Sequence, residues 1–411
     1  MNTSSHCPYR QSKNLQDALA PGKMRIGFML GAGCPYSITV SDGIGTKRLI
    51  PDILGLTTMV NDALSASEKF KNSYASLLKR FKGGAPANPS IEDILSHIRA
   101  LEDVVRDGTI DGLNKAALSE LDTEICRITT KVVSVDLPNS KTPYHQLANW
   151  IRGVERAHPI ELFTPNYDLL IEQALEASKI PYFDGFVGSK QAFFDLTSME
   201  TDKLPPRWAR VWKVHGSVNW WRQRVDKTDD EFEVVRTNTD KPSAEGRQMI
   251  YPSHLKYDES RRLPYLAMLD RLREFLAGGQ AVLVTCGYSF ADQHLNEVIL
   301  HGLRSNPTAK CFGLLYGQRA DYGVAVAKAL MHPNLSLLAR DGAVIGTVER
   351  DWHSEEKPDH SQHGVSVTKK VDLENAPTNC EFLLGDFKQF GNFLAQQLSR
   401  LDDEPLVANA A

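Results

Sequence analysis

A glycine-rich motif follows the first strongly apolar run of the chain and has residue types that can hold a phosphate. Gly31, Ala32 and Gly33 come directly after residues 24–30, and Ser37 lies shortly beyond them. Glycines let backbone amides approach a pyrophosphate closely, and a helix N-terminus would add a favourable dipole. A plain glycine turn has the same pattern, so this motif alone leaves both interpretations open. The GxxxxGK[ST] pattern of P-loop ATPases is absent from the sequence.

Two further motifs place an amide, a carboxylate and an imidazole at the ends of apolar runs. Asn166 and Asp168 follow residues 158–164, and His215 follows residues 210–214. Ligands of parallel α/β sheets collect outside the carboxyl ends of strands, so we expect these side chains to face a cleft. Asn and Asp at such positions also serve as helix N-caps. His215 is a candidate general base, since a neutral imidazole can accept a proton at cytosolic pH. A local hydrogen bond is its alternative role.

The fourth motif contains Gly287, Ser289 and Asp292 and follows another apolar run, residues 280–286. A glycine turn in which Asp292 caps the next helix would have the same pattern. Four polar motifs that each follow a predicted strand of one sheet are far less expected by accident than any one of them. We therefore interpret the four motifs as parts of a single site.

Apolar runs that alternate with helical patterns predict the elements that position these motifs. The predicted strands are residues 24–30, 158–164, 210–214, 280–286 and 310–316. The predicted helices between and after them are residues 167–178, 292–304 and 322–331. Strands that alternate with helices indicate an α/β fold with a doubly wound parallel sheet.

The remaining segments divide the chain around this sheet. We expect the sheet domain to span residues 24–345, with a helical insertion at 53–135 and a small β insertion at 217–255. The polar residues 1–23 are predicted to form a loose arm with a helical turn or two near its end. Residues 346–411 are predicted to form a C-terminal extension that closes with an amphipathic helix.

Composition and charge exclude several classes of protein. The hydrophobic fraction is 42% and the formal net charge is −4, which is typical of a globular protein and gives no electrostatic footprint for nucleic acid. The six cysteines form no CxxC pair, which favours a reducing compartment over a zinc or redox role. Neither a signal peptide nor an apolar stretch of roughly 18 residues is present. We expect a cytoplasmic protein without membrane association.

The ordered strings GAG, TPNYD, HGS and GYSFAD resemble the sirtuin-like (SIR2-type) family, and in particular its bacterial anti-phage defence branch. The resemblance covers roughly residues 24–340 and implies a Rossmann-like sheet that takes NAD+ as substrate. Sirtuins usually carry Gln before the Asn of the second motif, whereas Pro165 stands here, as in the defence-type relatives. The match to a deacylase is therefore incomplete.

The resemblance also implies a role for each residue of the four motifs. It implies that Asn166 holds the ribose hydroxyls or the attacking water, that Asp168 lies near the nicotinamide amide, and that His215 is the general base. The residues implied to hold the phosphates of NAD+ are Gly31, Ala32, Gly33, Ser37, Gly287 and Ser289.

Sirtuin deacylases carry a zinc ribbon of two Cys pairs after the catalytic histidine, and the cysteines that follow His215 here are not paired in this way. We therefore expect no zinc, and we favour water over acyl-lysine as the acceptor of the ribosyl group. An NAD-dependent deacylase or ADP-ribosyltransferase and a non-catalytic NAD- or ADP-ribose-binding module remain the alternatives. The defence branch further implies a homo-oligomer and a partner ATPase of the HerA type.

Overall fold

The computed structural model describes most of the chain. The described residues are 6–20, 22, 24–41, 43, 45–81, 88–105, 108–153, 156–224, 232–237, 247–250, 264–353, 365–369 and 380–401.

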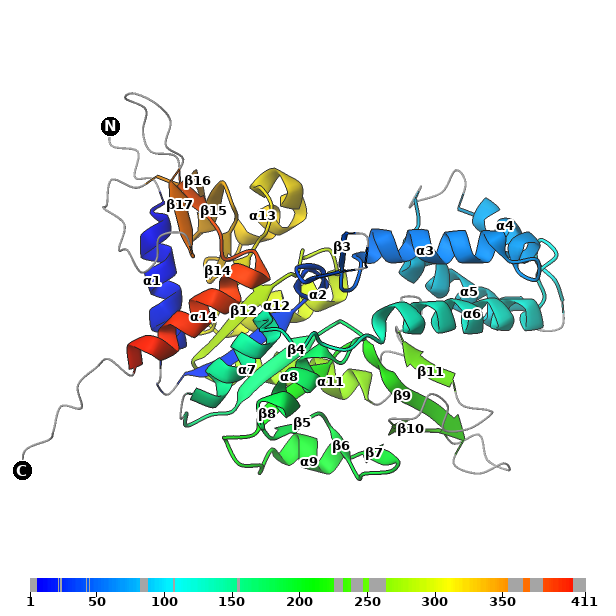
Figure 1. The fold of residues 1–411 in the computed structure, drawn as a ribbon, viewed down its shortest axis with the longest axis horizontal. Coiled ribbons are helices and arrows are strands. Elements are labelled where there is room, and N and C mark those ends of the chain that lie inside the picture. Colours follow the sequence, from blue (N-terminus) through cyan, green and yellow to red (C-terminus); the bar gives the residue numbers. More distant parts are fainter. Residues whose placement is uncertain are drawn as a thin grey trace, which may run out of the picture.

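A large, mostly parallel sheet forms the centre of the molecule (Figure 1). Within the described residues it has nine strands, and it is parallel from β14 to β5, while β15 and β16 continue it in antiparallel fashion. In spatial order the strands are β16 (Val348–Asp351), β15 (Gly342–Ile345), β14 (Leu335–Leu338), β13 (Lys310–Leu314), β12 (Ala281–Cys286), β1 (Arg25–Leu30), β4 (Ile160–Thr164), β8 (Ala209–Lys213) and β5 (Tyr182–Phe183). The predicted doubly wound α/β sheet is confirmed.

The chain winds outward from β1 in both directions. It first adds β4 and β8 on one side of β1, and later adds β12, β13 and β14 on the other side. This is the strand order of the Rossmann fold, in which the switch point lies between the first strand and the strand that begins the second half. In this chain the switch point therefore lies between β1 and β12.

One face of the sheet is covered by helices from both ends of the chain. These are α1 (Pro8–Leu19), α7 (Pro143–Gly153), α8 (Leu170–Ala177) and α14 (Phe387–Leu401). The Phe28 ring of β1 lies 5.6 Å from the Trp150 ring and 6.0 Å from the Phe390 ring, so α7 and α14 seal the middle of the sheet together. Figure 1 shows α14, in red, beside α7.

Helix α1 differs from the loose arm expected for this part of the sequence. It is a helix of 12 residues in which Tyr9, Leu15 and Leu19 are buried on one face. Pro8 fits the first turn of a helix, where its missing N–H is not needed. Burial of this apolar face against the sheet, together with the helix start at Pro8, stabilises a longer helix than the local polarity predicted.

The opposite face carries α11 (Tyr265–Ala277), α12 (Gln293–Ser305), the short 3-10 helix η1 (Arg319–Tyr322) and α13 (Gly323–Ala329). Phe163 of β4 packs on Phe275 of α11 with ring centroids 5.6 Å apart. Alternate residues of the central strands thus fill two separate cores, one on each face of the sheet.

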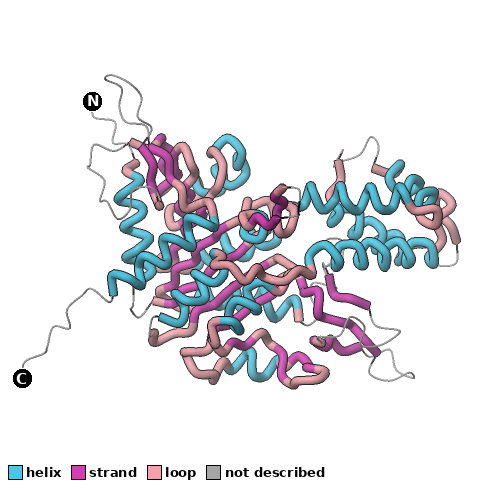
Figure 2. The backbone as a smooth tube through the Cα atoms, in the orientation of Figure 1, coloured by secondary structure: helices cyan, strands magenta, loops and turns pink. Residues whose placement is uncertain are grey.

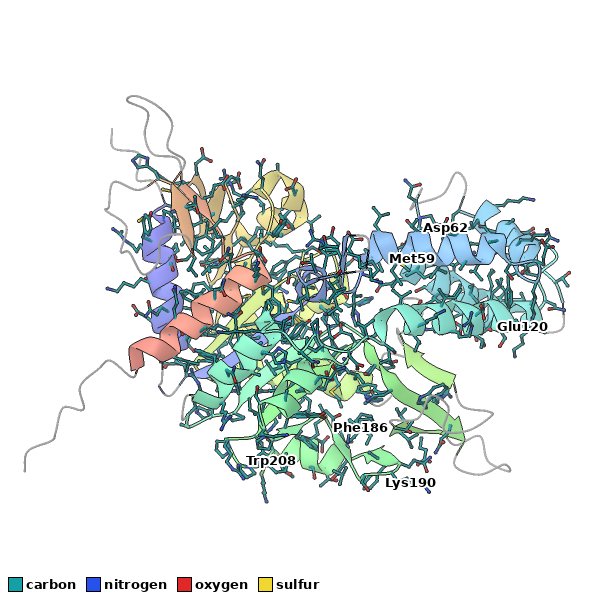
Figure 3. The ribbon with its side chains drawn as sticks, viewed as in Figure 1. Met59, Asp62, Glu120, Phe186, Lys190 and Trp208 are labelled. Atoms are coloured by element: carbon teal, nitrogen blue, oxygen red, sulfur yellow. The ribbon has the colours of Figure 1, made fainter. Side chains whose placement is uncertain are left out.

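Four helices project from the sheet as a separate layer with a core of their own (Figures 1 and 2). They are α3 (Ile53–Ala66), α4 (Lys71–Lys79), α5 (Ile91–Val105) and α6 (Lys115–Val133), all within the range predicted to be helical. Asp52 and Asn114 cap α3 and α6 through their side chains. Met59 of α3, marked in Figure 3, is 48% exposed on this layer.

A second, antiparallel sheet lies beside the helical layer. Its strands are β11 (Arg247–Ile250), β9 (Gly216–Arg224), β10 (Phe232–Arg236), β7 (Ala192–Phe194) and β6 (Phe186–Val187). The strands β6 and β7, with Phe186 marked in Figure 3, come from before the range predicted for the β insertion. They are too short to show alternation in the sequence. The residues 225–231, 238–246 and 251–255 of the predicted insertion lie outside the described residues.

Shorter elements complete the fold. They are α2 (Gly33–Tyr36), β2 (Thr39–Ser41), β3 (Thr46–Arg48), α9 (Leu196–Thr201), β17 (Val367–Lys369) and β18 (Cys380–Phe382). The described part of the predicted C-terminal extension is not separate from the sheet domain, because α14 contributes Phe387, Phe390 and Leu394 to the core beneath α7. None of the described helices is both long and apolar enough to cross a membrane.

Candidate functional site

The carboxyl ends of β12, β1, β4 and β8 lie side by side in the sheet, and each leads into one of the four motifs. At the switch point the two glycine motifs pack backbone against backbone. The N–H of Gly31 donates to Cys286 O at 2.9 Å, and the N–H of Gly33 donates to Gly287 O at 3.0 Å. A Cβ at Gly31 would lie 2.3 Å from Gly287 O. The loops can therefore approach each other this closely only because these positions are glycine.

Gly287 is constrained in two ways. Its φ of +64° lies in the left-handed region, and a Cβ there would lie 2.5 Å from the backbone N of Cys34. The hydroxyl of Ser37 donates to Cys34 O at 2.7 Å, a hydrogen bond within the first motif that fixes the turn after its glycines. Ala32 and Ser289 are exposed, so the loops present these two positions to solvent.

Asn166 ties the second motif to the first. Its backbone N–H donates to Thr164 Oγ1 at 3.0 Å, and its side-chain Nδ2 donates to Gly31 O at 3.1 Å. The Thr164 hydroxyl in turn donates to Leu30 O at 2.7 Å. The half-buried amide of Asn166 is thus held over the end of β1, next to the glycine loops.

Asp168 is buried and takes part in the start of α8. Its Oδ1 accepts the N–H of Leu170 at 3.1 Å, but Asp168 is not the N-cap of α8, because that position is Leu169. The main-chain oxygen of Asp168 accepts a hydrogen bond from Lys213 Nζ. Burial raises the pKa of the Asp168 carboxyl, and the nearby Lys213 ammonium opposes that rise. The carboxylate therefore lies beneath the surface of the site.

Lys213 and Glu172 form a buried ion pair that the sequence analysis did not identify. Lys213 Nζ lies 3.5 Å from Glu172 Oε1, and the Lys213 side chain is 2% exposed. Burial also raises the pKa of Glu172, again against the effect of Lys213. Lys213 ends a mainly apolar strand, β8. That position at the strand end was the one signal in the sequence that its ammonium could reach α8.

His215 faces the fourth motif. Its Nε2 lies 3.0 Å from Asp292 Oδ2, and both side chains are largely buried. The other carboxylate oxygen, Oδ1, accepts the N–H of Leu295 at 3.0 Å and caps α12. Asp292 is thus both the predicted cap and a partner of the histidine, and only the second role was missed. A carboxylate held by a helix terminus can fix the orientation of an imidazole.

The fourth motif is held from within by Tyr288 and Asn296. Tyr288 Oη donates to Asn296 Oδ1 at 3.0 Å, and Asn296 Nδ2 donates to Phe290 O at 2.7 Å. Phe290 has a φ of +59°, which is uncommon for a bulky residue. This network fixes the loop that carries Gly287, Ser289 and Asp292.

A hydrogen bond connects the helical layer to the site. Tyr167, which stands between Asn166 and Asp168, donates from Oη to Glu92 Oε1 of α5 at 3.2 Å. Its main-chain oxygen accepts the N–H of Val218 at 3.0 Å, just after the third motif. Tyr167 therefore connects the second motif, the third motif and the helical layer.

The structure thus brings the predicted residues together in two adjacent groups. Gly31, Gly33, Asn166 and Gly287 meet at the switch point, and His215 meets Asp292 beside them. Asp168 lies below, against Lys213. Among the described residues no group of three or more His, Cys, Asp or Glu side chains could hold a metal ion, and all six cysteines are free thiols.

Comparison with known proteins gives the following relationships. The family model of the SIR2-like domain matches residues 160–326, which include the second, third and fourth motifs. No curated protein matches the sequence.

Solved structures of Sir2 proteins are similar to this chain at low identity. One is a Sir2 enzyme whose structure concerns the mechanism and regulation of these enzymes. It has 10% identity and a TM-score of 0.39, and the match covers 96% of this chain and 100% of the Sir2 chain. A Sir2 homologue in complex with NAD has 15% identity and a TM-score of 0.38, over 77% and 86%. A Sir2 protein bound to a propionylated peptide has 14% identity and a TM-score of 0.33, over 75% and 87%.

Proposed function

We propose that this protein is an NAD+ glycohydrolase, which uses water to cleave NAD+ into nicotinamide and ADP-ribose. The observation that carries the proposal is the convergence of four polar motifs at the switch point of a Rossmann-ordered sheet. The match of residues 160–326 to the SIR2-like domain supports NAD+ as the substrate. We take residues 24–345 as the unit that carries this chemistry.

In this proposal the glycine loops hold the phosphates. The turn formed by Gly31, Ala32 and Gly33 faces one side of the pyrophosphate, with Ser37 behind it. Gly287 and Ser289 close the other side. The exposure of Ala32 and Ser289 supports the assignment, because these positions are open to a ligand.

The reaction breaks the bond between the ribose carbon and the nicotinamide nitrogen. The electron pair of that bond leaves with nicotinamide, the water oxygen bonds to the ribose carbon, and one water proton passes to His215. Asn166 positions the ribose hydroxyls or the water, and Asp168 lies near the nicotinamide amide. Positive charge develops on the ribose only in the transition state, so fixed acceptors lower the barrier there.

Asp292 has a positioning role in this mechanism. Its carboxylate, anchored by Leu295, orients the His215 ring and stabilises the imidazolium that forms when the proton arrives. Hydrolysis rather than transfer to acyl-lysine is supported by the absence from the sequence of the paired cysteines of the deacylase zinc ribbon.

We further propose that this activity serves anti-phage defence in the cytoplasm, where NAD+ depletion ends infection together with the host cell. The motif TPNYD, with Pro165 in place of the sirtuin Gln, supports this branch. By the same resemblance the working form is a homo-oligomer regulated by a ring-forming ATPase of the HerA type.

The experiment that tests the proposal is nicotinamide release from NAD+ by purified protein, alone and with a HerA-type ATPase. We expect release by the natural protein and release at least about 100-fold slower by His215→Ala. Release that requires an acyl-peptide would instead indicate a deacylase. Tight NAD+ binding without release in either condition would indicate a binding module and overturn the proposal.

A further inference from the structure

A cavity of about 350 Å³ lies between α8 and the second sheet, behind the four motifs. One wall is formed by Leu169 and by Glu172, Gln173 and Glu176 of α8. The other wall combines Tyr182 of β5 and Asp184 with residues of the second sheet, among them Asn219, Trp220 and Arg236. The size of the cavity is that of a small-molecule site.

The charge of this cavity is negative. Three carboxylates, those of Glu172, Glu176 and Asp184, line it against the single guanidinium of Arg236. Arg236 is already committed, because its Nη1 lies 2.6 Å from Asp184 Oδ2. Glu176 is exposed at the opening and accepts only the hydroxyl of Tyr182, at 2.9 Å. The charges of Glu172 and Glu176 are therefore not balanced by Arg236.

Two buried oxygen atoms in the lining have no hydrogen-bond partner among the described residues. Glu172 is 8% exposed, and while its Oε1 faces Lys213, its Oε2 has no partner. The side-chain oxygen of Asn219, on the opposite wall, also has none. A buried acceptor without a donor costs about 1–3 kcal/mol, and more for a charged group. An amide oxygen and the oxygen of an ionised carboxylate can only accept, so a ligand that satisfies both atoms must bring N–H or O–H donors.

We propose that this cavity binds an organic cation that carries N–H donors, an alkylammonium or a guanidinium. Carboxylates attract its charge, and the rings of Trp220 and Tyr182 provide apolar and cation–π contact. No group of three carboxylates converges on one point among the described residues, so a metal ion does not suit the site. The proposal does not depend on NAD+ hydrolysis, since the cavity is lined by none of the four motifs' assigned residues.

The test is calorimetric titration of the full chain with agmatine, which has a guanidinium at one end and an ammonium at the other. We expect saturable 1:1 binding with a dissociation constant at or below about 1 mM. Tetramethylammonium, which has the charge but no N–H donor, should bind at least about tenfold more weakly.

Variants place the binding in the cavity. Glu172→Gln should weaken agmatine binding at least about tenfold, because it removes the buried charge and leaves the shape. Glu172 also faces Lys213, so Glu176→Gln at the opening serves as a second variant that leaves that ion pair intact. The matched control is Glu297→Gln, an exposed glutamate on α12 that also accepts one side-chain hydrogen bond.

Each outcome bears on the proposal. Weaker binding in both cavity variants with no change in Glu297→Gln supports it, provided that thermal unfolding shows Glu176→Gln to be folded. No saturable binding by the natural protein overturns it. So does equal binding by the natural protein and folded Glu176→Gln, or equal binding of agmatine and tetramethylammonium.

Discussion

Charge is buried at both ends of the strands of the central sheet, but its arrangement differs. The end at which the parallel strands begin is called the amino edge, and the end at which they finish is called the carboxyl edge. At the amino edge, Glu161 accepts a hydrogen bond from Trp212 Nε1 at 2.8 Å and lies 3.7 Å from both Arg25 and Arg271. Arg271 continues to Asp202 at 3.1 Å. This edge is a network in which the buried carboxylate faces two cations and an indole donor.

At the carboxyl edge the buried charges lie opposite one another in pairs. His215 faces one carboxylate oxygen of Asp292. Glu172 has one oxygen near Lys213, and its second oxygen has no hydrogen-bond partner among the described residues. The loops there carry the left-handed φ of Gly287 and Phe290. Under the proposed function the charge at the carboxyl edge is arranged for a ligand, whereas the charge at the amino edge belongs to a buried ion-pair network.

The largest effect that tests this division is expected at His215. We predict that His215→Ala lowers NAD+ hydrolysis by about 10² to 10⁴-fold, the range for loss of a general base, and that Asn166→Ala also abolishes NAD+ loss. Nicotinamide release measures the rate, and circular dichroism checks the fold. Full activity in folded forms of both variants would contradict the view that the carboxyl edge, unlike the amino edge, serves catalysis.

The next largest effect is expected at the amino edge, on stability instead of rate. Arg271→Met leaves the buried Glu161 with one cation fewer, so we predict a loss of about 3 kcal/mol in the free energy of unfolding. Urea titration measures it. The control Arg304→Met, at an exposed site on α12, should change stability by less than about 0.5 kcal/mol. Equal losses in the two variants would contradict the prediction.

The same variant has a pH dependence with a fixed sign. Burial raises the pKa of Glu161, so the folded protein holds a proton there in a window where the unfolded chain has lost it. The contribution of Glu161 to stability therefore falls as pH rises through that window. We predict that the deficit of Arg271→Met shrinks as the pH falls from neutral toward the ordinary Glu pKa of about 4.3, because a protonated Glu161 needs no cation. If the stability loss of Arg271→Met grew as the pH fell, the predicted rise in the pKa of Glu161 would be contradicted.

A smaller effect separates the two roles of Asp292. Asn caps helices as well as Asp does, so Asp292→Asn should keep α12 stable. It removes the charge that faces His215, and we predict a loss of about 10 to 100-fold in kcat, the range for residues that orient a functional histidine. Asp52→Asn, at the cap of α3, is the matched control and should leave kcat unchanged. A fall in unfolding temperature in place of kcat would assign Asp292 to capping alone.

The smallest effect concerns the thiols of the sheet. Cys7 is half-buried and the other five cysteines are buried, and burial raises the pKa of Cys311 to about 12 and that of Cys34 well above its ordinary value. We predict that a disulfide reagent at mildly alkaline pH labels Cys7 first and the others only on unfolding. Mass spectrometry of the labelled chain identifies the sites. Rapid labelling of Cys34 with Cys311 protected would show that the glycine loops open.

The sequence predicted the sheet well because its central strands are buried on both faces and read as continuous apolar runs. The strands that were missed are short. Of these, β14 and β15 are apolar but have only four residues each, β16 consists largely of exposed polar residues, and β6 and β7 have only two or three residues each. Helix α1 was underestimated because its burial depends on a sheet that the local sequence does not describe.

The four motifs could be located from sequence because strand ends of a parallel sheet converge. Their partners could not. The pairing of His215 with Asp292 joins β8 to the start of α12, and that of Lys213 with Glu172 joins β8 to α8. Both depend on the sideways spacing of neighbouring elements, which no local pattern encodes. The glycines of the first motif likewise serve loop packing in a way that only the approach of Gly287 reveals.

The position of α14 has a consequence for how the protein is made. Strand β1, which begins the site, is among the first segments to leave the ribosome, but the ring of Phe28 is covered by Phe390, near the other end of the described chain. Until α14 is synthesised, the part of this face of the sheet that α1, α7 and α8 do not cover stays exposed to water, and the core beneath the strand ends is not closed. A nascent chain therefore cannot complete the site, and an activity that destroys NAD+ would begin only after translation of that helix.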